Sequence, residues 1–236
     1  MKRTYYLSLK IFLIGILFIP NIICQDNREK KMIKDSTSDI IQLPAPSFKS
    51  NTSVEEALLK RRSVRNYSNR QLSLSEISQI LWAAQGITDK ENGLRTAPSA
   101  GALYPLEVYL IAANIKDFDA GIYKYNPQNH TLMKTAAGDK REAIYNASLK
   151  QESIASSSAL IVITAIYERT SVKYGKRTER YVDIEVGHVG QNIYLQAVSL
   201  ELGTVMIGAF EDDALKKALN LPGNEHPLAL YPLGKL

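Results

Sequence analysis

RTERYVDIEVGHVGQNIYLQAVSLELG, residues 177–203, is the longest helical pattern in the chain. One face carries apolar side chains at helical spacing: Val182, Val186, Val189, Ile193, Ala197 and Leu200. Another face is mostly apolar as well, with Ile184, His188, Leu195, Val198 and Leu202. Such a surface predicts a helix buried on all sides. Gly187 and Gly190 would let a second helix approach closely, and we predict that this helix lies partly in an obligate homodimer interface.

The rest of the chain mixes strands and helices without regular βαβ alternation, which predicts an α+β fold. Strand patterns cover 107–113, 121–126, 131–134, 159–167, 204–208 and 229–233. Helix patterns begin at Ser53 and at Ser73 or Ser75, and two more cover 140–149 and 211–219. The apolar run 159–167 is typical of a buried central strand. Residues 121–134 are typical of a hairpin.

Composition argues against two classes of protein. The net charge of +5 over 236 residues is mild, and no basic stripe interleaved with aromatic residues occurs, so no nucleic-acid partner is expected. The histidines are scattered, so no metal site is predicted. His188, on the long helix, is expected to be a hydrogen-bonded core residue.

The N-terminus resembles an export signal. Lys2 and Arg3 precede an apolar run at 11–19 that is too short to span a bilayer. We predict a signal peptide over 1–24; lipidation at Cys24 and an uncleaved anchor are the alternatives, and only these two would add a membrane partner. All three predict export to the periplasm or the extracellular space. A polar tether is expected over 25–52, with 40–46 as an extended strap, and one domain over 53–236.

Three further segments could carry chemistry. Arg61-Arg62-Ser63-x-Arg65, the phosphate motif, offers guanidinium forks and a hydroxyl suited to a phosphate monoester, although a solvated basic helix end explains it equally well. The small-residue loop, 95–105, could bring backbone N–H donors close to a ligand, but it could also be a tight turn. Lys173 and Tyr174, the Lys–Tyr pair, could transfer a proton or be an ordinary exposed loop pair.

Other common sites are not supported. The chain has no Gly-x-Ser-x-Gly, no Walker loop and no Gly-x-Gly-x-x-Gly. Residues 201–210 form a glycine-bearing connection whose Gly208 could let the backbone reach a planar ligand.

In this order, the phosphate motif, the small-residue loop, the Lys–Tyr pair, Gly187-His188-x-Gly190-Gln191-Asn192, 203–210 and Tyr231-Pro232-Leu233-Gly234 resemble the nitroreductase superfamily. The subgroup is the SagB-type dehydrogenases, the azoline-oxidase-like branch. The resemblance covers residue 53 to the C-terminus. It implies a nitroreductase-like fold, in which helices flank an antiparallel-rich mixed sheet and a long helix lies at the interface of an intertwined homodimer with two flavins.

The resemblance also implies residue roles. Arg61, Arg62, Ser63 and Arg65 would hold the phosphate and ribityl chain of FMN, and Lys235 would assist them. Pro98, Ser99, Ala100 and Gly101 would meet the flavin of the partner subunit. Ile207, Gly208 and Ala209, the glycine turn, would face the isoalloxazine ring. Lys173 and Tyr174 resemble the pair with which azoline-oxidising relatives remove a proton.

Two features depart from the family pattern. Many nitroreductases have several basic residues beyond the final glycine, whereas here Lys235 is the only basic residue after Gly234. The subgroup usually works in a cytoplasmic peptide-modifying complex, which does not fit an exported single domain.

The leading hypothesis is an exported FMN-dependent oxidoreductase. It would transfer a hydride through flavin N5 to or from a small organic substrate, with NAD(P)H as a candidate electron donor. One alternative is an azoline dehydrogenase that acts on peptide heterocycles. The other is a non-catalytic flavin-binding or scaffold protein that keeps the fold.

Overall fold

The computed structural model describes residues 40–236. The predicted signal peptide, Cys24 and the first part of the tether lie outside the described residues. No helix within 40–236 has both the length and the apolar character needed to cross a membrane.

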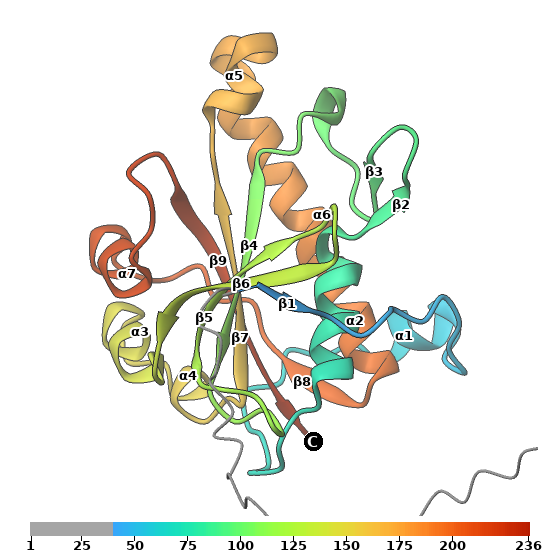
Figure 1. The fold of residues 1–236 in the computed structure, drawn as a ribbon, viewed down its shortest axis with the longest axis vertical. Helices are drawn as coiled ribbons and strands as arrows, with labels where there is room; N and C mark the ends of the chain where they lie inside the picture. The colour runs from blue at the N-terminus through green and yellow to red at the C-terminus, as the bar shows by residue number, and fades with distance from the viewer. Residues whose placement is uncertain (1–39) are drawn as a thin grey trace, which may run out of the picture. The chain divides into compact units, whose positions relative to one another are not determined.

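A seven-stranded sheet forms the centre of the domain (Figure 1), in the order β1-β6-β5-β4-β7-β9-β8. Its strands are β1 Ile40–Gln42, β4 Leu106–Ala112, β5 Gly121–Asn126, β6 Thr131–Ala137, β7 Ala159–Ala165, β8 Leu202–Thr204 and β9 His226–Lys235. Neighbouring strands pair antiparallel throughout. A separate ribbon joins β2 Ile87–Asp89 to β3 Leu94–Arg95. The α+β class is confirmed.

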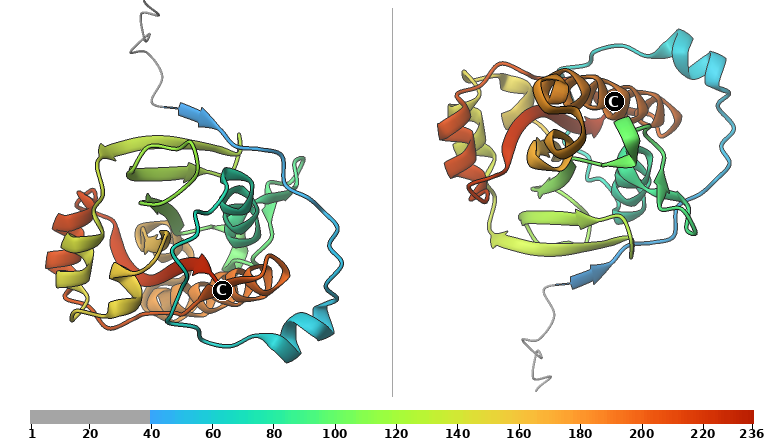
Figure 2. Two further views of the ribbon diagram at one scale, coloured as in Figure 1. Left: turned by 90° about the horizontal axis from the view of Figure 1, so that it is seen from below. Right: turned by 90° about the horizontal axis from the view of Figure 1, so that it is seen from above.

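Helices cover both faces of the sheet (Figure 2). The helices are α1 Val54–Lys60, α2 Leu74–Gln85, α3 Arg141–Ala147, α4 Glu152–Ala155, α5 Glu168–Tyr174, α6 Thr178–Ser199 and α7 Asp212–Leu219. One core layer joins α2 and α6 to the sheet, and a second joins α3 and α7 to its opposite face. β7 lies between the two layers with every residue buried, which accounts for its unbroken apolar pattern.

Serine N-caps mark the starts of α1 and α2. Ser73 opens α2 with a full capping box, because its hydroxyl accepts from the N–H of Glu76 while the Glu76 carboxylate accepts from the N–H of Ser73. Ser53 caps α1 in the same way, without the return bond. Gly86 follows the last residue of α2 as its C-cap.

The end of the long helix differs from the sequence expectation. α6 stops at Ser199, and Glu201 then turns the chain with φ 55°. The expected strand at 204–208 is misplaced, since it is 202–204 that pairs with β9. Gly203 is needed there because a Cβ would lie 2.9 Å from both Val64 and Leu236. Residues after Thr204 leave the sheet edge, and Ile207 returns to bridge Leu230.

α6 is not enclosed within one protomer, so the prediction of burial on all sides fails for the single chain. Its inner arc is buried at Val182, Val186, Val189, Ile193 and Ala197. Its outer stripe is uncovered: Ile184 is 47% exposed, and Gly187 and His188 face outward. His188 is therefore not a core residue of the protomer.

The segment before α1 packs against the domain as the expected strap. β1 pairs with β6, the N–H of Leu43 donates to His130 O at 3.2 Å, and the N–H of Ser47 donates to the Gln79 side chain at 2.8 Å. The strap therefore extends the sheet by one edge strand.

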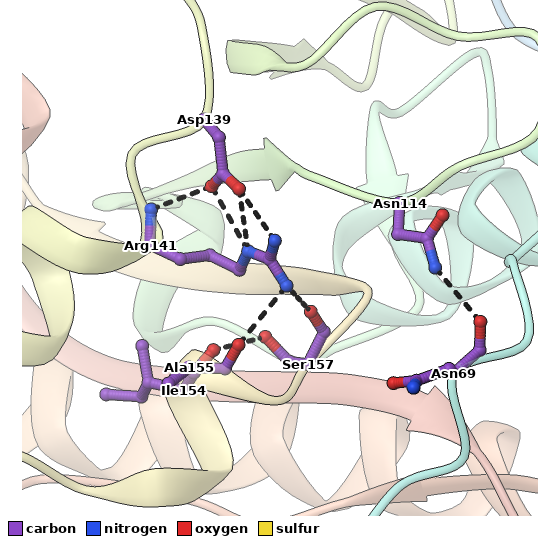
Figure 3. Close-up of polar contacts among 7 residues, drawn as sticks. All are labelled: Asn69, Asn114, Asp139, Arg141, Ile154, Ala155 and Ser157. Carbon is purple, nitrogen blue, oxygen red and sulfur yellow. Dashed lines mark hydrogen bonds and ion pairs between the residues drawn. The ribbon is translucent and has the colours of Figure 1, made fainter.

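Polar side chains fasten the connections at one end of the sheet (Figure 3). Arg141 pairs with Asp139 and donates to the carbonyls of Ala155 and Ser157, so it joins the start of α3 to the end of α4. Asn114 donates to the carbonyl of Asn69 at 3.3 Å. This bond helps to hold the segment that leads from the phosphate motif to α2.

Candidate functional site

The phosphate motif follows α1 and lies against α6. The guanidinium of Arg61 stands over the Tyr194 ring, 5.2 Å from its centroid. The Ser63 hydroxyl lies 3.1 Å from the Tyr194 hydroxyl. The N–H of Val64 donates to Thr204 O at 2.9 Å, which fixes the motif beside β8. The α1 helix thus delivers the motif to the C-terminal end of α6.

The arginines of the motif keep their charge available to a ligand. Arg62 donates to the carbonyls of Leu59 and Arg61, at the end of α1. Within residues 40–236, no carboxylate pairs with Arg61, Arg62 or Arg65. Guanidinium groups that face no carboxylate suit a phosphate dianion.

Tyr194 joins the phosphate motif to the glycine turn. Its hydroxyl accepts from the N–H of Met206 at 2.8 Å while it contacts Ser63. Sequence reasoning missed this residue, because a tyrosine in a helix gives no sign of a partner from another segment.

The glycine turn presents open backbone. Ile207 is buried, whereas Gly208 and Ala209 are exposed. A Cβ on Gly208 would meet nothing closer than the Met206 methyl at 3.6 Å. Gln151 donates to Ala209 O at 3.1 Å, so the turn is held against the α3–α4 side of the domain. A planar ring could approach this backbone closely.

Lys235, in β9, already forms an ion pair with a carboxylate. Its ammonium contacts the Glu76 carboxylate in the capping box of α2. Burial alone would raise the pKa of Glu76, but hydrogen bonds from Lys235 and Ser73 outweigh it and lower that pKa. The predicted phosphate contact of Lys235 would therefore compete with an existing ion pair.

The small-residue loop is folded on itself at the other end of α6. Its Ser99 hydroxyl accepts from the N–H of Tyr104 at 2.9 Å, and the Tyr104 hydroxyl accepts from the N–H of Arg95 at 3.2 Å. The Arg95 guanidinium stacks over the Tyr104 ring, 4.4 Å from its centroid. Gly101, with φ 65°, adopts the left-handed conformation that this tight loop requires.

The Lys–Tyr pair lies beside that loop. It ends α5, so the pair lies at the end of a helix and not in the loop that the sequence suggested. A Cβ placed on Gly101 would lie 2.9 Å from the Tyr174 hydroxyl and 3.0 Å from Lys173 Nζ. The two polar ends therefore converge on one point of the loop. Tyr174 also packs edge-on against Tyr181 of α6, at 4.7 Å between centroids.

Arg169, which sequence reasoning also missed, connects α5 to the loop. It donates to Tyr104 O at 3.0 Å and pairs with Glu107 at the start of β4. Glu107 in turn pairs with Lys124, which pairs with the buried Glu225. This chain of charges anchors the pair to the sheet.

Glu185 lies in the core beneath the loop. It is 2% exposed and neither carboxyl oxygen completes a hydrogen bond. Burial raises its pKa to about 7, although Ser99, Gln85 and Arg95 lower it in part. The sequence showed only a glutamate among apolar neighbours on α6.

A hollow of about 940 Å³ is lined by the strap, α1, α2 and α6. None of the predicted site residues lines it. Phe48, 78% exposed, lies at its rim against Trp82. Across residues 40–236 no cluster of three potential metal ligands occurs.

Comparison with known proteins decides the family. The nitroreductase family model matches residues 58–235. The chain belongs to the nitroreductase family. MJ1384 of Methanocaldococcus jannaschii, which its name assigns to the nitroreductases, is 44% identical over 84% of this chain and 98% of its own length.

Two further relatives refine the assignment. The microcin B17-processing protein McbC of Escherichia coli is 29% identical over 64% of this chain, which spans just over half of McbC at 57%. This likeness supports the SagB-type branch. A crystal structure of a protein from Ralstonia eutropha JMP134, also assigned to the nitroreductases, has a TM-score of 0.75 and 28% identity, covering 85% of this chain and 90% of that one. The nitroreductase-like fold is thus confirmed, and its members are typically flavin-dependent oxidoreductases.

Proposed function

We propose that this nitroreductase-family protein is an FMN-dependent oxidoreductase that works as a homodimer outside the cytoplasm. The observation that carries the proposal is the joining of the phosphate motif to the glycine turn through Tyr194. The guanidinium groups of the phosphate motif and the exposed backbone of the glycine turn therefore lie on either side of Tyr194. This arrangement fits a ligand with a phosphate at one end and a flat ring at the other.

Bound FMN would supply hydride transfer at its N5 atom to or from a small organic substrate, with NAD(P)H as a candidate donor. The chain's residues would do the rest. Arg61, Arg65 and Ser63 bind the phosphate, and the backbone beside Gly208 supports the ring. Lys173 Nζ and Tyr174 Oη hold or accept the proton that leaves a substrate as its hydride departs.

The absorbance spectrum of the purified domain tests this proposal. We expect a yellow protein whose flavin band bleaches with NADH, NADPH or a substrate. A colourless protein that takes up no added FMN would contradict the proposal and favour the scaffold alternative. Arg61→Ala with Arg65→Ala should lower FMN affinity at least tenfold, whereas Arg70→Ala, a basic neighbour outside the motif, should not.

A second candidate is azoline dehydrogenation on a peptide heterocycle. The convergence of Lys173 and Tyr174 favours it, together with the likeness to McbC, whose name links it to microcin B17 processing. Such a reaction removes a hydride and a proton from neighbouring atoms, and the pair would take the proton. Flavin bleaching by an azoline peptide, with no bleaching by NAD(P)H, would select this candidate.

A further inference from the structure

The small-residue loop takes a course that its own side chains do not favour. Gly101, Ala102 and Tyr104 have φ values of 65°, 54° and 46°. Glycine adopts this left-handed conformation freely, whereas alanine and tyrosine adopt it only at a cost in free energy. Contacts with other groups must therefore hold the loop in this shape, and strained backbone of this kind gathers at functional sites.

Ser99 holds the loop from within. Its hydroxyl oxygen accepts from the N–H of Tyr104 at 2.9 Å, and its carbonyl accepts from the N–H of Ala102 at 3.1 Å. Because the hydroxyl is the acceptor in the first of these bonds, its own hydrogen is left for another partner. A partner for that hydrogen would fix the orientation of the Ser99 side chain, and with it the turn that Ser99 closes.

The carboxyl group of Glu185 lies beneath Ser99. It is 2% exposed, and the Ser99 hydroxyl and the Gln85 side-chain amide lie beside it, since both lower its pKa. Neither of its oxygens completes a hydrogen bond within residues 40–236, and nor does Gln85 Nε2. Gln85 Oε1 accepts from Arg95 Nη1 at 2.9 Å, which leaves Gln85 Nε2 as the amide atom available to the carboxylate.

Arg95 completes a ring of polar groups around the base of the loop. Its guanidinium stacks over the Tyr104 ring, 4.4 Å from the centroid, and its backbone N–H donates to the Tyr104 hydroxyl at 3.2 Å. The ring runs from Glu185 through Gln85, Arg95 and Tyr104 to Ser99. It is open at the Glu185 carboxylate, where two donors face two acceptors.

Packing alone does not account for this glutamate. A carboxylate at this depth is unfavourable for folding, because burial disfavours its charged form and no completed hydrogen bond compensates for it. An apolar side chain of similar volume would fill the same space without that cost. The side chain is therefore better explained by the donors that it can orient.

We propose that Glu185 is a positioning residue for the Lys–Tyr pair. Its carboxylate accepts from the Ser99 hydroxyl and from Gln85 Nε2, and thereby keeps Gly101 at the point on which the polar ends of the pair converge. Glu185 itself does not touch the substrate. This inference rests on the proposed function, because that function gives the pair a proton to take.

Glu185→Leu and Glu185→Gln together test this role in the folded protein. Leucine cannot accept a hydrogen bond, whereas the glutamine amide oxygen can. Glu185→Leu should therefore raise the hydrogen-exchange rate of the Tyr104 amide about tenfold, measured by NMR, and should alter the near-ultraviolet circular dichroism of the Tyr174–Tyr181 contact. Glu185→Gln should restore most of both signals. Asp183→Leu, at an exposed acid two residues earlier on α6, should change neither.

Reduction of bound flavin gives the second readout. With an azoline peptide as reductant, Glu185→Leu should lower the rate constant at saturating peptide about tenfold, because the pair takes a proton in that reaction, and should leave the half-saturating concentration nearly unchanged. NADPH gives up a hydride without a proton, so its rate should stay close to that of wild type. Glu185→Gln should recover most of the rate with the peptide.

The controls separate the possible failures. Unchanged Tyr104 exchange in Glu185→Leu would overturn the inference, and so would an equal slowing with both reductants, which indicates a general loss of structure. The double variant with Ser99→Ala should exchange no faster than Ser99→Ala alone, and additive effects would show that Glu185 does not act through Ser99. Glu185→Leu should fold, because an apolar side chain replaces a buried charge. A wild-type protein without FMN would contradict the proposed function, whereas a loaded wild type with unchanged exchange in Glu185→Leu contradicts only this inference.

Discussion

Two residues at or beneath the small-residue loop, Glu185 and Gly101, occupy constrained environments. Glu185 is a carboxyl group in an apolar core, which disfavours its ionised form. Gly101 is a backbone position that must stay free of a side chain, because two polar groups occupy the space beside it. Each gives a prediction that does not depend on flavin binding.

Glu185→Gln should remove a pH dependence of stability. The folded protein holds the Glu185 pKa at about 7, against 4.5 for the ordinary side chain. The folded state therefore binds more protons between these values, and this contribution to the free energy of unfolding is lost as the pH rises toward 7. The variant should gain up to about 3 kcal/mol relative to wild type between pH 4.5 and 8. Urea unfolding at both pH values measures it, and an equal difference at both would contradict the prediction.

Gly101→Ala should displace the Lys–Tyr pair with little loss of folding beyond that of a matched control. Gly93 has φ 66° against 65° for Gly101, but its Cβ would meet nothing within 4 Å. Both alanine variants should lose about 1–2 kcal/mol for the left-handed backbone. Only Gly101→Ala should alter the near-ultraviolet circular dichroism, because it moves Tyr174 from Tyr181. Identical spectra for the two variants would argue against the convergence.

Helices and strands could be predicted from the sequence wherever nearby residues, such as caps or an unbroken apolar run, determine them. Ser73, Glu76 and Gly86 mark both ends of α2, and the apolar run of β7 marks a buried strand. α5 was missed because it buries only Thr170 and has no apolar stripe. Its position depends on Arg169 and its long-range partners, Tyr104 and Glu107. The roles of Tyr194 and Glu185 depend likewise on segments far away in the sequence.

The α2 cap offers a test at this scale. Ser73→Ala removes the hydroxyl that accepts from the N–H of Glu76 and should lower the free energy of unfolding by about 1 kcal/mol. Ser75→Ala, inside the first turn and exposed, should change it by a few tenths at most. Chemical denaturation of the two variants side by side measures the difference, and equal stabilities would refute the capping assignment.

For the whole molecule, the sequence predicted the family, but it could not show which of the candidate site residues lie close together in one protomer. The apolar pattern correctly predicted a long helix at α6. The prediction that this helix is buried on all sides was wrong for one protomer, because its outer stripe is uncovered. Periodicity reports which side chains avoid water, and it does not say whether the covering atoms belong to the same chain.

The proposed homodimer should therefore depend on the outer stripe of α6. Ile184→Lys places a charge in the middle of that stripe and should convert the protein to a monomer at micromolar concentration, with loss of FMN. Met133→Lys, at a similarly exposed apolar position on β6, should leave a dimer. Light scattering measures both, and a dimeric Ile184→Lys protein would contradict the placement of the interface.

The strap has a consequence for the solubility of shortened forms. β1 occupies the outer edge of the sheet and uses the free hydrogen-bonding groups of β6 from Thr131 to Met133. A chain that starts at residue 53 would leave that edge bare, and a bare edge strand is a template on which other molecules can add. The strap therefore protects this edge of the sheet from aggregation. This role does not involve the site, and only three paired residues perform it.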